Sequence, residues 1–145
     1  MMNNDHHDVA ELVVLVDDDS ASLREIRRVL EEIGLRVLGF TAASAALAAA
    51  LSRRPDAIVI AHAGVDVEGL ALADRVRAAH GDESPAFVAI ARSPAALGPV
   101  ARRAYDVILR RPVGVDELVG AIDDALVLRA SRLTRRSARR ARAAE

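Results

Sequence analysis

Two clusters of charged side chains in this sequence come directly after apolar runs, where they could act together. One is a triplet of aspartates at 17–19, and the other is an Arg-Arg-Pro sequence at 110–112. An arginine can bind a carboxylate through two parallel hydrogen bonds, which a lysine cannot do. The sequence therefore predicts a bidentate pair between Arg111 and Asp17 or Asp18.

The last part of the chain, residues 129–145, is strongly basic. It holds seven arginines against one glutamate, a net charge of +6, whereas residues 1–128 hold 13 arginines against 20 aspartates and glutamates, a net charge of −7. On a helix, these arginines fall within an arc of about 160° and could bind phosphates or an acidic surface. They are Arg129, Arg132, Arg135, Arg136, Arg139, Arg140 and Arg142.

Several states of this basic tail are open. Repulsion between neighbouring arginines predicts a frayed segment that orders against an anionic partner. The tail could instead remain solvated, or fold back over the aspartates at 17–19. Nucleic acid is the less favoured partner, because no aromatic residue is interleaved with the arginines. We expect residues 129–145 to add little stability, since Leu133 is their one large apolar side chain.

Between these clusters, the chain alternates apolar runs with helical patterns, over a length of 145 residues that suits one domain. Continuous apolar runs predict strands buried on both faces, and this alternation is typical of a parallel sheet with helices on both sides. Ser20 is predicted to cap the first helix. The predicted strands are 12–16, 35–40, 56–60, 86–91 and 105–109, and the predicted helices are 20–33, 42–53, 70–79, one from 93 that is interrupted at 98–99, and one from 115.

The sequence lacks the residues and motifs that several classes of functional site require. There is no cysteine, which excludes disulfides, thiolate metal sites and cysteine nucleophiles. The glycine-rich motifs of dinucleotide and P-loop sites are missing, as is the Gly-x-Ser-x-Gly elbow of hydrolases. No apolar run approaches the ~18 residues of a membrane span, and the start does not resemble a signal peptide. The sequence predicts a cytoplasmic domain that is neither an enzyme nor bound to a membrane.

Over roughly residues 10–127, the sequence resembles the receiver domain of bacterial response regulators. The resemblance rests on VVLVDDDS at the first strand, RRPDAIVI at the third and LRRPVGVDEL after the fifth. It implies a five-stranded, doubly wound sheet of order 2-1-3-4-5, with a cis peptide bond before Pro112. It also implies an acidic pair for Mg²⁺, an aspartate that accepts a phosphoryl group, and a hydroxyl and a lysine that stabilise the phosphorylated state.

The sequence departs from this pattern at the switch. The acidic pair is kept as Asp17 and Asp18, but the acceptor position is Ala61, the hydroxyl position is Ile90 and the lysine position is Arg111. Alanine has no oxygen to phosphorylate, so the chain is interpreted as a degenerate pseudo-receiver. We expect Arg111 to take the place of Mg²⁺ and to fix one conformation. The alternatives are that this arginine extends into solvent, or that the two aspartates retain weak Mg²⁺ binding.

Three further residues bear on the switch. An alignment slip of one residue would bring His62 to the acceptor position, and Asp66 lies further along the chain. Both are interpreted as loop residues. Ile108 stands where receivers carry the aromatic side chain that moves on phosphorylation.

The sequence thus predicts a flexible N-terminus at 1–9, a receiver-like domain at 10–128 and an Arg-rich extension at 129–145. The predicted function is that of a phosphorylation-independent signalling adaptor without a cofactor, whose partner is a kinase or a motor or output protein. The alternative is an effector that binds cyclic di-GMP or nucleic acid through the tail. It rests on receiver-like proteins whose Arg-rich C-terminal extension binds cyclic di-GMP and is similar in position and composition.

Overall fold

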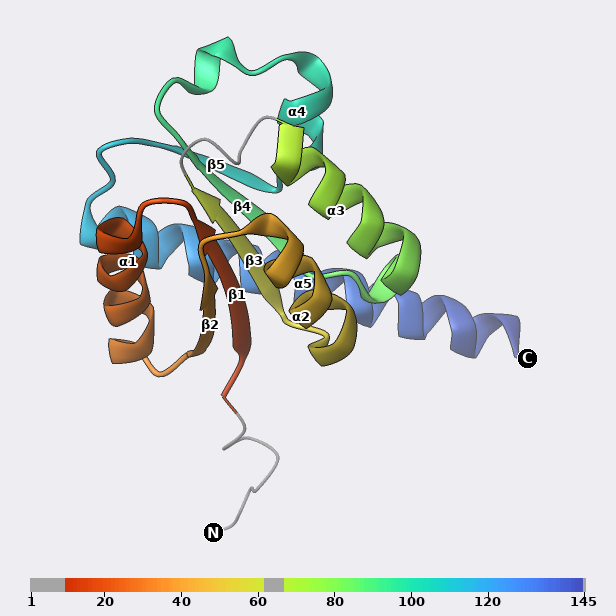
Figure 1. Ribbon diagram of the computed structural model, residues 1–145. Helices are drawn as coiled ribbons and strands as arrows, with labels where there is room; N and C mark the ends of the chain where they lie inside the picture. Colours follow the sequence, from red (N-terminus) through yellow and green to blue (C-terminus); the bar gives the residue numbers. More distant parts are fainter. Residues whose placement is uncertain (1–9, 62–66, 145) are drawn as a thin grey trace, which may run out of the picture.

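The computed structural model describes residues 10–61 and 67–144. Within them, the five predicted apolar runs form one parallel sheet of order β2-β1-β3-β4-β5 (Figure 1). Both faces of the sheet are covered, which explains why β1, β3 and β4 are apolar and buried along almost their whole length. The predicted fold class and strand order are confirmed. The strands are β1 (Leu12–Asp17), β2 (Arg36–Phe40), β3 (Ala57–Ala61), β4 (Ala86–Ala91) and β5 (Val107–Arg110).

Helices pack on both faces of the sheet. On one face, α1 and α5 bury Leu30 and Ile122, and on the other, α2, α3 and α4 pack around Phe87. Two short 3₁₀ turns, η3 and η4, flank β4. The elements are α1 (Ser20–Glu32), α2 (Ala43–Arg53), α3 (Val67–His80), η3 (Gly81–Glu83), η4 (Pro94–Ala96), α4 (Pro99–Ala104) and α5 (Val115–Ala143).

The predicted cap of α1 is wrong, whereas the predicted interruption before α4 is right. Asp19, not Ser20, is the N-cap of α1, because its extended backbone leaves it outside the helix and lets its carboxylate accept the N–H groups of Ala21 and Ser22. The interruption predicted in the fourth helix is confirmed. Residues 94–96 form only a 3₁₀ turn, and α4 begins afresh at Pro99.

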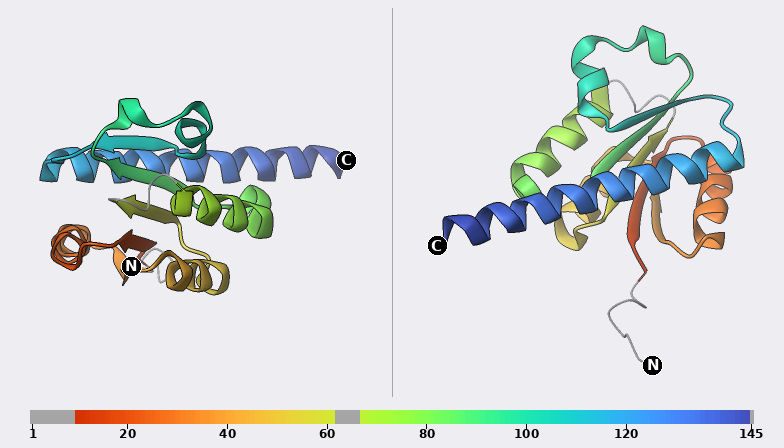
Figure 2. Two further views of the ribbon diagram at one scale, coloured as in Figure 1. Left: turned by 45° about the horizontal axis from the view of Figure 1, so that its top comes forward. Right: turned by 180° about the vertical axis from the view of Figure 1, so that it is seen from behind.

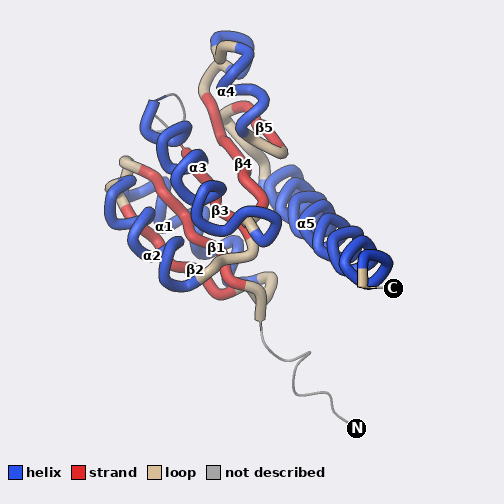
Figure 3. The backbone as a smooth tube through the Cα atoms, turned by 90° about the vertical axis from the view of Figure 1, so that its right-hand side faces the viewer, coloured by secondary structure: helices blue, strands red, loops and turns tan. Residues whose placement is uncertain are grey.

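The last helix, α5, runs for 29 residues without a break from the sheet into the basic tail. Its first half packs Leu118, Ile122 and Ala125 against the sheet, and only the last turns of its second half project past the body (Figures 2 and 3). The boundary expected at residue 128 lies inside this helix, so residues 129–143 are helical where the sequence predicted a frayed tail. No helix in the described part of the chain is long and apolar enough to cross a membrane.

Candidate functional site at the carboxyl edge of the sheet

The carboxyl ends of β1, β3 and β4 bring three of the predicted site residues together. The strand register pairs Asp17 with Ala61, and Ala61 with Ile90. The three residues therefore lie side by side at the edge where open α/β sheets bind their ligands.

Asp17 is the buried acid of this edge, with 0% exposure. Its Oδ1 accepts a hydrogen bond from the backbone N–H of Asp19 at 3.0 Å, and its Oδ2 lies 3.5 Å from Nη2 of Arg111. A carboxylate that has left water must be hydrogen-bonded or paired with a cation, and Asp17 has both kinds of contact.

Arg111 follows β5 and turns back toward the sheet, so that its side chain is only 21% exposed. Nη2 also donates to Oγ of Ser22 on α1 at 3.2 Å. The predicted bidentate pair is not formed: Nη2 lies nearest Asp17 at 3.5 Å and also donates to Ser22, while the buried Nε of Arg111 has no hydrogen-bond partner within the described residues. Arg111 thus connects β1, α1 and the loop after β5. The peptide bond between Arg111 and Pro112 is cis, as the resemblance implied.

Over the residues that the structure describes, the side chains at this edge do not by themselves form a Mg²⁺ site. A divalent ion needs several oxygen ligands around one point. Asp17 instead faces a guanidinium, Asp19 caps α1, Asp18 is exposed and Ala61 offers only a methyl group. Among the described residues, no group of three or more acidic or histidine side chains could hold a metal ion.

Apolar side chains stand at three positions where the resemblance led us to look for the acceptor, the hydroxyl and the moving aromatic side chain of a receiver. Ala61 and Ile90 are buried, and neither has a side-chain oxygen. Ile108 packs into the core on the opposite face, with α2, α3 and α4. His62 and Asp66 lie outside the described residues, as does the N-terminal segment 1–9.

Solved structures with the same architecture are receiver domains. A CheY-like receiver domain from Methylobacillus flagellatus is 26% identical with a TM-score of 0.71, over 81% of this chain and 99% of that one. The chain has the receiver fold. A receiver domain from Methanospirillum hungatei JF-1 is 19% identical with a TM-score of 0.73, over 85% of this chain and 98% of that one. NtrX from Brucella abortus, in complex with ADP, is 22% identical with a TM-score of 0.77, over 90% of this chain and 29% of that one. No family model and no curated protein matches the sequence.

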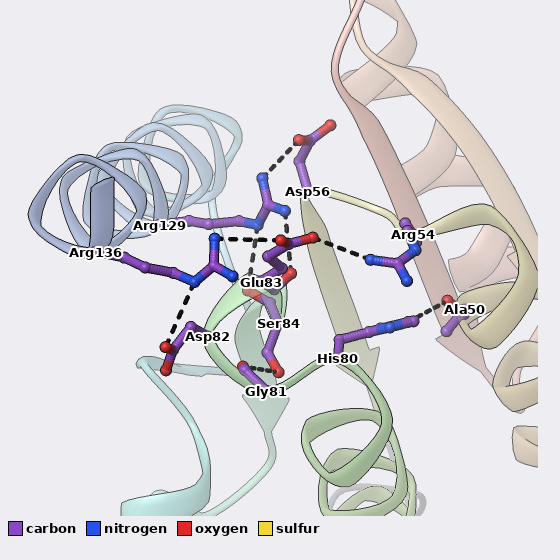
Figure 4. A network of polar contacts seen from close by, with 10 residues as sticks. All are labelled: Ala50, Arg54, Asp56, His80, Gly81, Asp82, Glu83, Ser84, Arg129 and Arg136. Atoms are coloured by element: carbon purple, nitrogen blue, oxygen red, sulfur yellow. Dashed lines mark hydrogen bonds and ion pairs between the residues drawn. The ribbon is translucent and has the colours of Figure 1, made fainter. Parts of the chain in front are cut away.

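The basic tail binds the opposite, amino edge of this receiver fold. Arg129 donates from Nη1 to Oδ1 of Asp56 at 2.9 Å, from Nη2 to the carbonyl of Glu83 at 3.1 Å and from Nε to the carbonyl of Ser84 at 3.2 Å (Figure 4). The other oxygen of Asp56 accepts the backbone N–H of Leu12 at 2.8 Å. Arg129 therefore joins the amino ends of β1 and β3 to the loop before β4.

Two more tail arginines continue this contact. Arg132 lies 3.2 Å from Oδ1 of Asp106, the residue before β5. Arg136 reaches Asp82 at 3.5 Å and Glu83 at 3.3 Å (Figure 4). The three-arginine contact of the tail with the amino edge is called the amino-edge clamp below, and it consists of Arg129, Arg132 and Arg136.

The expectation that the tail could fold back over the aspartates at 17–19 is wrong, because those aspartates lie at the carboxyl edge of the sheet and the tail contacts the amino edge. α5 starts after β5 at the carboxyl edge and crosses the sheet against the strands, so a continuous helix delivers its end to the amino edge. The remaining tail arginines are exposed and form no ion pair within the described part of the chain. They are Arg135, Arg139, Arg140 and Arg142.

The amino edge also perturbs one titrating group. Burial raises the pKa of Glu11, and repulsion from Asp56 and Asp123 raises it further, while Arg129 acts in the opposite direction. Glu11 is therefore a weaker acid than usual, and Arg129 offsets only part of the rise in its pKa.

The sequence reasoning missed the partners of the clamp. Asp56 and Asp106 each stand directly before an apolar strand, at the edge toward which the last helix must run. An acid immediately before a buried strand was the signal that could have identified them.

Proposed function

We propose that this receiver-fold protein is a signalling adaptor that works without phosphorylation, with Arg111 in the place of the metal ion. The observation that carries the proposal is the contact of Arg111 with the buried Asp17, beside an alanine at the acceptor position. The likeness to receiver domains supports a role in response-regulator signalling, which is generally a binding role rather than an enzymatic one.

The physical argument concerns charge. In a receiver, the phosphoryl group adds negative charge at the carboxyl edge of the sheet. The lysine side chain there then pairs with this charge, and the conformation of the edge changes. Here a permanent cation already lies against Asp17 and is held by Ser22 as well. With no acceptor at Ala61, no charge change reaches this cation, and the loop after β5 keeps one position relative to α1.

A fixed edge favours constitutive partner binding over switching. The expected partner is another signalling protein, such as a kinase or an output protein, that recognises the surface in this one state. Response of the system would then come from the amount of the adaptor, or from a second ligand, rather than from a phosphoryl group.

The exposure of four tail arginines supports a second candidate, an effector that binds an anionic ligand through the tail. The clamp already occupies Arg129, Arg132 and Arg136, so this candidate rests on the other four. Cyclic di-GMP and nucleic acid are the ligands to compare, and nucleic acid binding should weaken steeply with salt.

A Mg²⁺ titration followed by amide NMR shifts tests the main proposal. For the wild-type protein, we expect no saturable shift at residues 17–19 in the millimolar range. For Arg111→Ala, which removes the guanidinium from beside Asp17, we expect weak binding to appear, whereas the exposed neighbour Arg110→Ala should behave as the wild type. Millimolar Mg²⁺ binding at residues 17–19 of the wild type would show that Arg111 does not replace the ion.

A further inference from the structure

A cleft of about 600 Å³ lies far from the carboxyl edge, between α4, the end of α3 with η3, and the second half of α5. Small-molecule sites commonly have volumes of about 300–1,000 Å³. The amino-edge clamp contributes Arg132 to its lining, and a ligand site in this cleft would deepen the second candidate function, which rests in part on Arg135 and Arg139. Its charged lining is dominated by arginines from three helices, which are Arg77, Arg103, Arg132, Arg135 and Arg139.

The acidic side chains of the cleft are already engaged. Asp106 uses one oxygen for Arg132 and the other for the backbone N–H of Phe87 at 2.7 Å. Asp82 contacts Arg136, which does not line the cleft. Asp106 also acts on Arg77, which lies near it, but neither acid forms an ion pair with Arg103, Arg135 or Arg139 within the described residues.

One arginine of the cleft is fixed in its wall. The guanidinium of Arg77 lies over the ring of Phe87, 4.3 Å from its centroid, and donates to the carbonyl of Ala104. Burial lowers the pKa of Arg77, the direction expected for a cation that has lost part of its hydration. The wall of the cleft thus holds one preorganised cation, Arg77, while Phe87 beneath it is fully buried and does not line the cleft.

Three other arginines of the cleft have no carboxylate partner within the described residues. Arg103 comes from α4, and Arg135 and Arg139 come from α5. The last two are four residues apart on one helix face, where like charges repel each other by about 0.2–0.5 kcal/mol. An anion in the cleft would relieve this repulsion and bridge α4 to α5.

We propose that this cleft binds a small molecule that carries a diphosphate group. Arginine matches phosphate oxygens through forked hydrogen bonds. A terminal phosphate carries about 1.5–2 negative charges at neutral pH, so two phosphate groups match three uncompensated guanidiniums. A nucleic acid fits less well, because the arginines converge on one hollow instead of following a track, and no aromatic face is open for stacking.

Isothermal titration calorimetry of the full chain with inorganic pyrophosphate and with ADP, at physiological salt, tests this site. We expect both to bind, and the double variant Arg135→Ala/Arg139→Ala to weaken both by roughly tenfold or more, because it removes two charge-assisted contacts. The matched control is Arg140→Ala/Arg142→Ala, which removes the same charge from the same helix outside the cleft. It should change the affinity less than about twofold, the difference expected from long-range charge alone after screening.

A second variant separates binding from folding. Arg103→Ala lies on a different helix and should also weaken pyrophosphate binding without a change in the far-ultraviolet circular dichroism spectrum. The proposal is overturned if pyrophosphate does not bind, or if the two double variants lose affinity equally. It is also overturned if a single-stranded oligonucleotide binds more tightly than ADP with a steep salt dependence. None of these outcomes bears on the proposed adaptor role, which rests on Asp17 and Arg111.

Discussion

Replacement of Arg129 by alanine should destabilise the protein, although Arg129 lies in a segment that the sequence marks as a tail. Its three guanidinium nitrogens bind Asp56 and two backbone carbonyls, and its side chain is 15% exposed. A hydrogen bond that involves a charged group contributes about 1.5–3 kcal/mol, and the three contacts share one side chain and are not additive. We expect Arg129→Ala to lower the free energy of unfolding by about 2–3 kcal/mol, since Asp56 is left without its cation.

Urea unfolding followed by circular dichroism measures this loss, and thermal unfolding should show a midpoint lower by roughly 6–15 °C for a chain of this length. Arg140→Ala is the matched control, because Arg140 is exposed on the same helix, and it should stay within about 0.5 kcal/mol of the wild type. If Arg129→Ala also stayed within that range, the tail would not be fixed to the sheet, and the reasoning about the amino-edge clamp would be refuted.

Three other changes test neighbouring parts of the structure. Deletion of residues 129–145 should lower the thermal midpoint at least as much as Arg129→Ala, because it removes the whole clamp; an unchanged midpoint would support the sequence-based expectation instead. Asp19→Ala should cost about 1 kcal/mol in urea unfolding as the N-cap of α1 is lost, while Ser20→Ala should be nearly neutral, and the reverse order would move the cap to Ser20. The raised pKa of Glu11 means that folding favours its protonated form, so the native state loses stability as pH rises through that pKa. Glu11→Gln should therefore raise the thermal midpoint at pH 7 but not below the ordinary pKa of 4.5, and an equal effect at both pH values would contradict this cause.

The fold could be predicted from the sequence because its signals are local. Buried parallel strands must be apolar on both faces, so continuous apolar runs such as 12–16 and 86–91 can be recognised as strands from the sequence. The Gly98-Pro99 pair likewise indicates an interruption of the fourth helix, because proline does not fit a helix interior. The cap of α1 was harder, because Asp19 and Ser20 are both good capping residues. Only the backbone conformation decides between them, and it places Asp19 just outside the helix.

The sequence predicted which residues lie together at the candidate site, but not which atoms of these residues are in contact. Alignment of motifs was enough to bring Asp17, Ala61 and Ile90 to one edge, because strand register fixes neighbours. The geometry of Arg111 depends on which oxygens the backbone has already taken, and a sequence does not show this. The clamp was missed for a different reason. The sequence shows that the tail is basic and the body acidic, but it does not show that the last helix runs to the aspartates that precede β3 and β5 instead of to those at 17–19.

The central claim is that this receiver fold works without a phosphoryl group, and intact-mass spectrometry after incubation with acetyl phosphate and Mg²⁺ tests it most directly. Since Ala61 has no oxygen to accept a phosphoryl group and Arg111 lies against Asp17, the protein should keep its unmodified mass and its amide NMR spectrum. A stable phosphoryl adduct on any aspartate, Asp66 included, together with shifts along β4 and β5, would contradict the account.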